Sequence, residues 1–303
     1  MKFAFQDSNV VRRRVIAITV VSVLSLLVGV GVSASTTKFS GPYAMAIGNG
    51  NLWVTNDHGN WVTELNATDG SLVRVIRAKS DDFATPDALA ISESDVWIAN
   101  GANNTVTELN ATNGSLVRVI RAISDGLSTP TTLVASDSRL WVANFSGNTI
   151  TELNATNGSL VRVIRSYADG LRRPWCLVAS RSTIWVANEA NNSITELNAT
   201  SGALVRVIRA QSNDLRAPTA IALSPSLVWI ANSTPGGNPD SSFITEVNAT
   251  NGSLVRVIDT KSDEFNYPDR VVVSRRHVWI ANNGGNTITE LNVTNGSLIR
   301  VIR

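Results

Sequence analysis

Few side chains in this chain have the type and spacing that catalysis or metal binding requires. The 303 residues include two histidines, His58 and His277, and one cysteine, Cys176. A single cysteine can form neither an intramolecular disulfide nor a cysteine-based metal cluster. No phosphate-binding loop, Ser-His-Asp pattern or zinc-ligand spacing occurs in the sequence. We therefore expect Cys176 to be a buried, inert thiol and the two histidines to be solvated loop residues.

Two carboxylates are stronger candidates, because Asp87 and Asp269 each directly follow a proline. Paired carboxylates could bind Ca²⁺ or Mg²⁺ through oxygen ligands, or they could hold a cationic ligand. The alternative interpretation is that they are ordinary polar residues, or that they pair with the neighbouring Arg270. The choice depends on the elements that position them.

Those elements come from a sequence repeat. The phrase Thr-Glu-Leu-Asn-Ala-Thr-x-Gly-Ser-Leu-Val-Arg-Val-Ile recurs six times, slightly altered in the later copies, and its asparagine advances in steps of 44, 44, 44, 50 and 44 residues. A second phrase, Trp-[Val/Ile]-[Ala/Thr]-Asn, keeps the same period. Its tryptophans are Trp53, Trp97, Trp141, Trp185, Trp229 and Trp279. Repeats of about 40–50 residues that hold four strand-like runs are typical of propeller blades.

The second copy shows how one blade is built. Apolar or alternating runs over 86–92, 96–100, 105–110 and 116–120 are separated by turn residues, and Gly114 is available for a positive φ angle. Four strands of about five residues joined by such turns form an antiparallel meander. No window in residues 36–303 has helical periodicity, so the fold is expected to be all-β.

Six complete copies are present, each opened by a proline. The sequence predicts a six-bladed β-propeller of four-stranded antiparallel blades over residues 36–303. The blades are expected at about 42–77, 86–121, 130–165, 174–209, 218–259 and 268–303. Because no strand is left over at either end, we expect a monomeric ring that closes through blade-to-blade packing alone.

The most frequent residues of the repeat have structural explanations. A large aromatic residue at one place in every second strand fills the wedge between adjacent sheets. Glu64 and Arg74 fall opposite each other across a hairpin and predict an outer-strand charge pair, which contributes ~0.2–1 kcal/mol. The Asn-x-Thr triplets match a glycosylation sequence, but Asn and Thr at a hairpin bend are also ordinary turn formers.

The repeat also resembles a known family. Trp53-Val54-Thr55-Asn56 followed by Thr-x-Thr-Glu-Leu-Asn is similar to the bacterial YVTN-type β-propeller repeat, and more distantly to NHL repeats and the virginiamycin B lyase group. The resemblance implies a propeller over residues 36–303. Likeness to the lyase group would further imply a catalytic histidine with a bound Mg²⁺ near the channel, whereas His58 and His277 lie in different kinds of loop.

The two faces of such a propeller differ in this chain. Turns within the third-to-fourth-strand hairpins are nearly identical, whereas loops on the opposite face vary and include the longer segment 233–242. Variable loops on a repeating scaffold usually carry recognition. The residue after each opening proline is expected to ring the channel mouth on this variable face. These residues are Tyr43, Asp87, Thr131, Trp175, Thr219 and Asp269, with Arg270 next to the last of them.

The N-terminal 35 residues are expected to be a targeting segment. Arg12, Arg13 and Arg14 precede an apolar run from Val15 to Val32, and Val32-Ser33-Ala34 suits cleavage before Ser35. The run is also long enough to remain as a membrane anchor. Both interpretations place the propeller outside the cytoplasm, either secreted or tethered by an uncleaved helix.

Charge and the repeat together indicate the class of function. Residues 1–34 hold four basic residues and one acidic residue, which leaves 22 basic and 23 acidic residues in the remainder. This balance disfavours nucleic-acid binding, because that function relies on an excess of basic residues. We expect a non-enzymatic propeller that binds a protein, a glycan or a small ligand through Tyr43, Asp87, Trp175, Asp269 and Arg270, without a cofactor. The alternatives are a metal-assisted lyase or hydrolase using Asp87 and Asp269, and a nucleic-acid-binding propeller.

Overall fold

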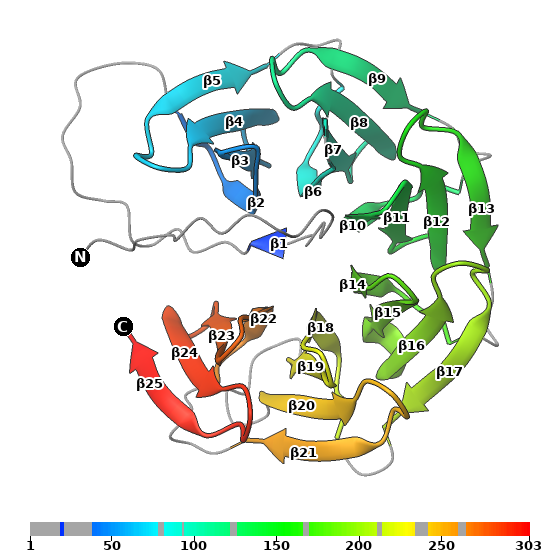
Figure 1. Ribbon diagram of the computed structural model, residues 1–303, viewed down its shortest axis with the longest axis vertical. Coiled ribbons are helices and arrows are strands. Elements are labelled where there is room, and N and C mark those ends of the chain that lie inside the picture. Colours follow the sequence, from blue (N-terminus) through cyan, green and yellow to red (C-terminus); the bar gives the residue numbers. More distant parts are fainter. Residues whose placement is uncertain are drawn as a thin grey trace, which may run out of the picture.

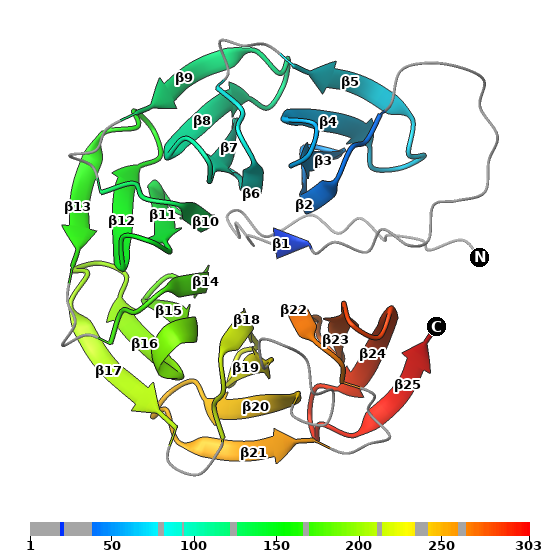
Figure 2. The same cartoon turned by 180° about the vertical axis from the view of Figure 1, so that it is seen from behind.

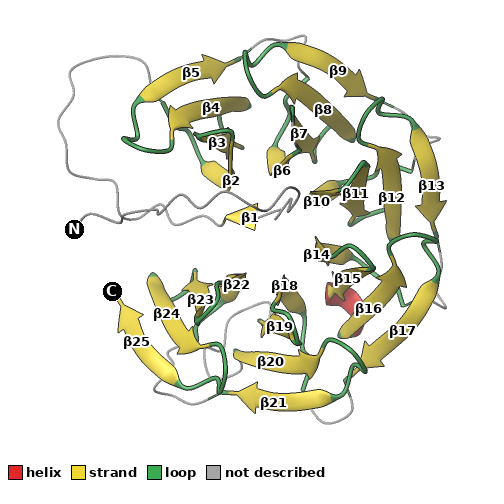
Figure 3. Ribbon diagram, viewed as in Figure 1, coloured by secondary structure: helices red, strands yellow, loops and turns green. Residues whose placement is uncertain are grey.

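The computed structural model describes residues 19–20, 38–77, 82–92, 94–121, 126–165, 170–210, 214–233, 242–259 and 265–303. Six four-stranded antiparallel blades are arranged in a ring (Figure 1). Coloured by secondary structure, the described part of the ring consists of strands and their connecting loops, with a 3-10 turn, η3 (Glu189–Asn191), in blade four (Figure 3). The all-β, six-bladed prediction is confirmed.

Each blade is a meander whose strands follow sequence order from the channel to the rim. Blade one contains β2 (Pro42–Gly48), β3 (Asn51–Asn56), β4 (Trp61–Asn66) and β5 (Leu72–Ile76). Blade two contains β6 (Pro86–Ile91), β7 (Asp95–Asn100), β8 (Thr105–Asn110) and β9 (Leu116–Ile120). Blade three contains β10 (Pro130–Ser136), β11 (Arg139–Asn144), β12 (Thr149–Asn154) and β13 (Leu160–Ile164).

The second half of the ring repeats the pattern. Blade four contains β14 (Pro174–Ala179), β15 (Thr183–Asn188), β16 (Ser193–Asn198) and β17 (Leu204–Arg209). Blade five contains β18 (Pro218–Leu223), β19 (Leu227–Asn232), β20 (Phe243–Asn248) and β21 (Leu254–Ile258). Blade six contains β22 (Pro268–Val273), β23 (His277–Asn282), β24 (Thr287–Asn292) and β25 (Leu298–Ile302).

One strand was not predicted. β1 (Thr19–Val20) pairs antiparallel with β2, with Thr19 opposite Ala46 and Val20 opposite Met45, and makes the blade-one sheet five-stranded. The inner edge of a blade has no other strand to pair with, so a β-branched segment can add to it. Apart from these two residues, the predicted targeting segment lies outside the described residues. Among the residues that are described, no helix is long and apolar enough to cross a membrane.

The core lies between the blades. In blades one to five, the tryptophan on the second strand is fully buried, at 0–1% exposure. Each of these tryptophans contributes to an apolar cluster shared with the next blade. Trp97, for example, packs with Leu133 and Val142 of blade three. The wedge role is therefore confirmed for these five residues. Trp279 of blade six is the exception, since it is only partly buried and lies parallel to the His277 ring, with the two centroids 6.0 Å apart.

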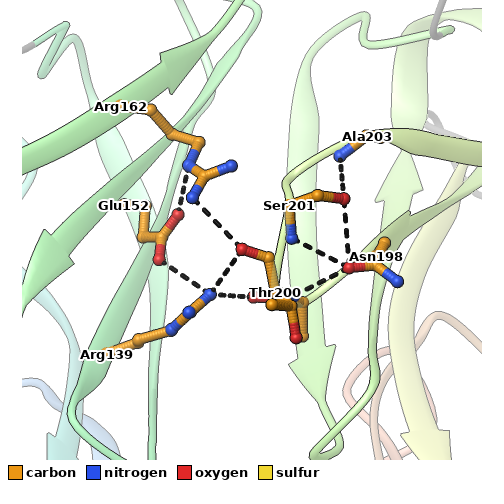
Figure 4. Close-up of polar contacts among 8 residues, drawn as sticks. Arg139, Glu152, Arg162, Asn198, Thr200, Ser201 and Ala203 are labelled. Carbon is orange, nitrogen blue, oxygen red and sulfur yellow. Dashed lines mark hydrogen bonds and ion pairs between the residues drawn. The ribbon is translucent and has the colours of Figure 1, made fainter.

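The predicted glutamate–arginine pairs form in every blade, and the glutamate of each pair is buried. Figure 4 shows the pair that Glu152 forms with Arg162. Glu64 lies directly opposite Arg74, and its carboxylate receives the Arg74 Nε at 2.7 Å. The glutamate side chain is 0% exposed, and Trp53 lies opposite it on the neighbouring strand. A buried pair of this kind is costly to break, unlike a surface pair.

His277 was placed wrongly as a solvated loop residue. It is the first residue of β23, and its Nδ1 contacts the buried Glu290 carboxylate. His58 is a loop residue as predicted, with a side chain that is 79% exposed.

Candidate functional site

A β-bulge positions the residue that follows each opening proline. Pro86 pairs with Asn100, and the register then skips Asp87 before Ala88 pairs with Ala99. The same shift occurs in all six inner strands, and in blade one it skips both Tyr43 and Ala44. A bulge redirects the side chain of the extra residue. Seen from either side of the ring, the inner strands β2, β6, β10, β14, β18 and β22 surround the axis (Figures 1 and 2). The six post-proline residues therefore lie at equivalent positions at one end of these strands.

Two of these six residues have a structural task. The Thr131 hydroxyl donates to the carbonyl of Pro174 at 3.3 Å, and the Thr219 hydroxyl donates to the carbonyl of Pro268 at 2.7 Å. Each threonine thus joins its inner strand to that of the next blade. Among the described residues, the side chains of Tyr43, Asp87, Trp175 and Asp269 make no such bond to a main-chain carbonyl of the next blade.

Arg270 forms the centre of one charged group. Its guanidinium lies 5.4 Å from the centroid of the Tyr43 ring, close enough for a cation–π interaction. It also donates from Nη1 to the Asp269 carbonyl at 2.7 Å, while Asn283 donates to the Asp269 carboxylate at 3.3 Å. Burial alone would lower the pKa of Arg270, but Tyr43 and Asp269 beside it raise the pKa above its ordinary value. The structure thus brings Tyr43, Asp269 and Arg270 together.

Asp87 adds a second carboxylate with unusual acidity. Burial raises its pKa to about 6, the nearby negative charge of Asp57 raises it as well, and Arg270 opposes both effects. The carboxylate rests against the backbone of Gly101, where an ideal Cβ would lie 2.1 Å from Asp87 Oδ2. No hydrogen bond or ion pair joins the Asp87 carboxylate to another of the described residues. Burial raises the pKa of Asp269 too, against the effects of Arg270 and Asn283.

Trp175 belongs to a separate aromatic group on blades three and four. Its ring meets that of Phe145 edge to face at a centroid distance of 5.3 Å. The Arg173 guanidinium lies over the Phe145 ring, 4.9 Å from its centroid. Its Nη1 is 3.8 Å from the Glu189 carboxylate. The Trp175 ring is therefore already in contact with Phe145, and no contact among the described residues joins it to the Arg270 group.

The sequence interpretation missed a second set of residues at the mouth. Each directly follows the asparagine that pairs with the opening proline, so it lies beside the post-proline residue of its own blade or of the next one. The set comprises Asp57, Gly101, Phe145, Glu189, Ser233 and Asn283. The sequence did contain an indication of this set, because a different residue follows Trp-x-x-Asn in each of the six copies. Of the long 233–242 loop, only Ser233 and Ser242 lie among the described residues.

Metal-binding groups are sparse in this arrangement. Within the described part of the chain, no three His, Cys, Asp or Glu side chains come together as ion ligands. Asp57 and Asp87 supply two acids, and Arg270 already compensates part of their charge. Cys176 lies on β14, half-buried, and burial raises the pKa of its thiol although Arg270 lowers it. A raised thiol pKa disfavours the nucleophilic thiolate.

Comparison with known proteins supports the fold. No family model and no curated protein sequence matches the chain. Among solved structures, it is similar to hydrazine synthase from Kuenenia stuttgartiensis, with a TM-score of 0.71, 14% identity and 90% of each chain covered. It is also similar to a catalytically inactive virginiamycin B lyase from Staphylococcus aureus with quinupristin, with a TM-score of 0.73, 18% identity, and 88% and 86% of the two chains covered. A third structure is the Pan2 WD40 domain from Neurospora crassa, with a TM-score of 0.65, 12% identity, and 83% and 75% coverage.

These likenesses define the class of protein as a β-propeller. The repeat resemblance to YVTN-type and NHL-like propellers, with the more distant likeness to the virginiamycin B lyase group, is consistent with them. At such low identities the comparison extends to the fold and not to the activity.

Proposed function

We propose that this protein is a non-enzymatic binding propeller that works outside the cytoplasm and recognises a ligand bearing a positively charged group. The observation that carries the proposal is the Asp87 carboxylate, which lies half-buried beside Asp57 without a hydrogen-bonding partner among the described residues. A cation bound there would relieve the repulsion between two negative charges. The charged group could belong to a small molecule, a protein side chain or an amino sugar.

The neighbouring side chains suit the rest of such a ligand. Tyr43 offers an aromatic face at the same mouth, and the Trp175–Phe145 pair offers a second aromatic surface on blades three and four. Aromatic residues provide large contact areas at low cost in side-chain entropy and dominate many binding sites. Asp269 and Arg270 would contribute polar contacts at the edge.

A metal-assisted lyase or hydrolase is the second candidate. A carboxyl with a pKa of about 6 is a suitable general base near neutral pH, and Asp57, Asp87 and Asp269 are the acids available for an ion. No three metal-ligating side chains come together among the described residues, so we rank this function below simple binding.

The proposal is tested with 2-phenylethylamine as a probe, because it combines an ammonium group with an aromatic ring. Calorimetric titration should show binding to the purified protein and none of the neutral analogue 2-phenylethanol. The double variant Asp57→Asn/Asp87→Asn should lose binding while its melting temperature stays the same or rises. A substitution on the opposite face, Asn113→Ser, is the matched control and should bind normally.

Equal binding of the amine and the alcohol would contradict the proposal, as would unchanged binding by the double variant. Stoichiometric Ca²⁺ or Mg²⁺ in the purified protein, lost in the double variant, would favour the enzyme instead.

A further inference from the structure

Each third-to-fourth-strand hairpin turn begins with an asparagine whose amide nitrogen is free. The triplet Asn-x-Thr opens the turn in every blade, at Asn66, Asn110, Asn154, Asn198, Asn248 and Asn292. In all six, the asparagine Oδ1 accepts a hydrogen bond from the main-chain N–H of the threonine, at 2.8–2.9 Å. No hydrogen bond joins the Nδ2 of these asparagines to another of the described residues. The turn therefore fixes each side chain through its oxygen and leaves its nitrogen available.

Blade four shows the arrangement in detail (Figure 4). Asn198 Oδ1 accepts from the Thr200 N–H at 2.9 Å, from the Ser201 N–H at 2.8 Å and from the Ser201 hydroxyl at 3.1 Å. The main-chain N–H and C=O of Asn198 pair with Ala203 and Gly202 within the turn. Among the described residues, Nδ2 is thus the polar group of Asn198 that lacks a partner. Hydrogen bonds to the oxygen polarise the amide and make its N–H more acidic.

The threonine of each triplet is equally accessible. These exposed residues are Thr68, Thr112, Thr156, Thr200, Thr250 and Thr294. Their hydroxyls make no hydrogen bond to another described side chain or main-chain group. An asparagine two residues before a Ser or Thr hydroxyl is the acceptor sequence for asparagine-linked glycosylation, provided that the residue between them is not proline. Both groups that an acceptor needs are therefore free at the surface of every turn.

The structure separates these triplets from others with the same sequence pattern. Asn144 and Asn232 also begin Asn-x-Ser/Thr triplets, but both are 0% exposed, and the Nδ2 of Asn144 donates to the Thr151 hydroxyl at 2.9 Å. Asn103 and Asn191 match as well, and they donate from Nδ2 to main-chain carbonyls in the loops that precede their blades, at 2.7 and 2.8 Å. In these four the amide nitrogen is already engaged, so the sequence pattern alone does not define an acceptor.

An apolar band lies beside the turns, on the outer strands. The large apolar side chains exposed there include Leu72 at 36%, Val73 at 42% and Leu254 at 48%. Leu72 pairs with Leu65, the residue that precedes Asn66, so the band adjoins the acceptor asparagine. Each outer strand is also the last strand of its sheet. An exposed apolar edge strand invites pairing with another chain unless something covers it.

We propose that the hairpin turns are acceptor sites for asparagine-linked glycosylation, and that the attached sugars cover the apolar outer strands. Glycans are bulky and solubilising, and from these positions they coat the face of the hairpin turns and the rim. The variable face stays uncovered for its ligand. The inference rests on the extracytoplasmic location in the proposed function, and it does not depend on amine binding.

The chemistry needs a glycosyl donor and a transferase. The asparagine Nδ2 attacks the anomeric carbon of an oligosaccharide that is linked through pyrophosphate to a polyprenyl lipid. A C–N bond forms as the C–O bond to the pyrophosphate breaks. The lipid pyrophosphate leaves with the bonding electrons, and the amide proton passes to a base of the transferase.

Transfer to the folded full chain in vitro tests the acceptor sites. The protein is incubated with a polyprenyl-pyrophosphate-linked oligosaccharide and an oligosaccharyltransferase, and glycopeptides are mapped by mass spectrometry. Blades one and four are decisive, because Asp69 and Ser201 replace the asparagine of a second triplet, Asn-Gly-Ser, that the other four turns contain. We expect Asn66 and Asn198 to be modified and Asn144 to remain unmodified.

Thr68→Ala is the matched control, because it removes the hydroxyl and keeps the main-chain N–H that bonds to Asn66. It should abolish transfer to Asn66 and leave Asn198 modified to the same extent. A synthetic Asn-Ala-Thr peptide in the same reaction shows that the transferase is active. Modification of the peptide without modification of the folded chain would overturn the proposal, and so would transfer to Asn144 as fast as to Asn66.

Light scattering of the modified and unmodified chains tests the cover. The unmodified chain should associate at concentrations at which the glycosylated chain stays monomeric. Val73→Lys/Val255→Lys should reduce the association of the unmodified chain, because it places charges on the outer strands. Equal association of all three proteins would overturn the cover and leave the acceptor sites standing. Titration of 2-phenylethylamine into the unmodified chain tests the proposed function separately, and its failure would not alter the glycosylation result.

Discussion

Arg206 donates from Nη2 to the main-chain carbonyl of Thr250, 2.9 Å away on the next blade. At the same time its Nε pairs with Glu196 of its own blade at 2.7 Å. This double contact explains why the hairpin turns are nearly identical in all copies. Each turn supplies the main-chain carbonyl that accepts from the arginine of the preceding blade, so a change in the turn would disturb two blades at once. The loops of the opposite face have no such common partner, so they can differ.

The first prediction concerns this arginine. Arg206→Ala should lower the free energy of unfolding by about 3–5 kcal/mol, because it leaves the buried Glu196 carboxylate without its partner. The exposed Arg209 on the same strand is the control, and Arg209→Ala should cost less than about 0.5 kcal/mol. Urea denaturation of the two variants makes the comparison, and similar midpoints would show that the buried pair has no special role.

The second prediction concerns the repeated tryptophan. Trp141→Ala should cost about 3–5 kcal/mol, because its fully buried side chain fills the wedge between blades. Trp61 is only partly buried, with the Arg77 guanidinium 4.0 Å from its ring centroid, so Trp61→Ala should cost much less. Equal melting temperatures for the two variants would contradict the wedge assignment.

The third prediction concerns pH. Burial raises the pKa of Glu108 and of Glu246 to about 7, against the opposing effects of Arg118 and Arg256, from an ordinary value of 4.5. Between these two pH values the folded protein binds more protons at these sites than the unfolded chain. Their contribution to stability is therefore fully present below pH 4.5 and is lost as the pH rises through 7.

Urea denaturation of the wild type and of Glu246→Gln at pH 5 and pH 8 measures this contribution. The loss of stability between the two pH values should be smaller in the variant. An identical loss in both proteins would mean that Glu246 does not titrate in this range.

The fourth prediction concerns the space that Gly101 leaves for Asp87. Gly101 has no positive φ, so alanine fits its backbone, yet the added Cβ would lie 2.1 Å from Asp87 Oδ2. Gly101→Ala should therefore push the Asp87 carboxylate towards solvent and lower its pKa from about 6 towards the ordinary value of 3.8. Carboxyl titration by NMR reports the change, and an unaltered pKa would show that Gly101 does not confine Asp87.

The strands could be predicted from the sequence nearly to the residue, because the pattern of one blade is confirmed by five others. The run predicted over 96–100 is β7 (Asp95–Asn100), and that over 105–110 is β8 (Thr105–Asn110). The cross-strand partner of Glu64 could also be predicted, since hairpin register follows from turn length. Its burial could not, because it depends on how closely the next blade approaches.

The site could be predicted only in part. The bulge after each proline follows the repeat, so Tyr43, Asp87, Trp175 and Asp269 could be named as equivalent positions. The proximity of Asp57 to Asp87 depends on how the loops of neighbouring blades lie relative to each other, and the repeat does not specify this arrangement. The lower burial of Trp279 in blade six could not be foreseen either, because near-identical repeats predict identical burial of their tryptophans.

The titration of 2-phenylethylamine into the wild type and into Asp57→Asn/Asp87→Asn tests the central claim most directly. The account predicts saturable binding of one amine per chain to the wild type and its loss in the double variant, with no loss of melting temperature. The amide side chains keep the shape of the carboxylates and remove only their charge, so any difference reports electrostatic recognition. Equal affinity for the two proteins would contradict a cation-binding site at the channel mouth.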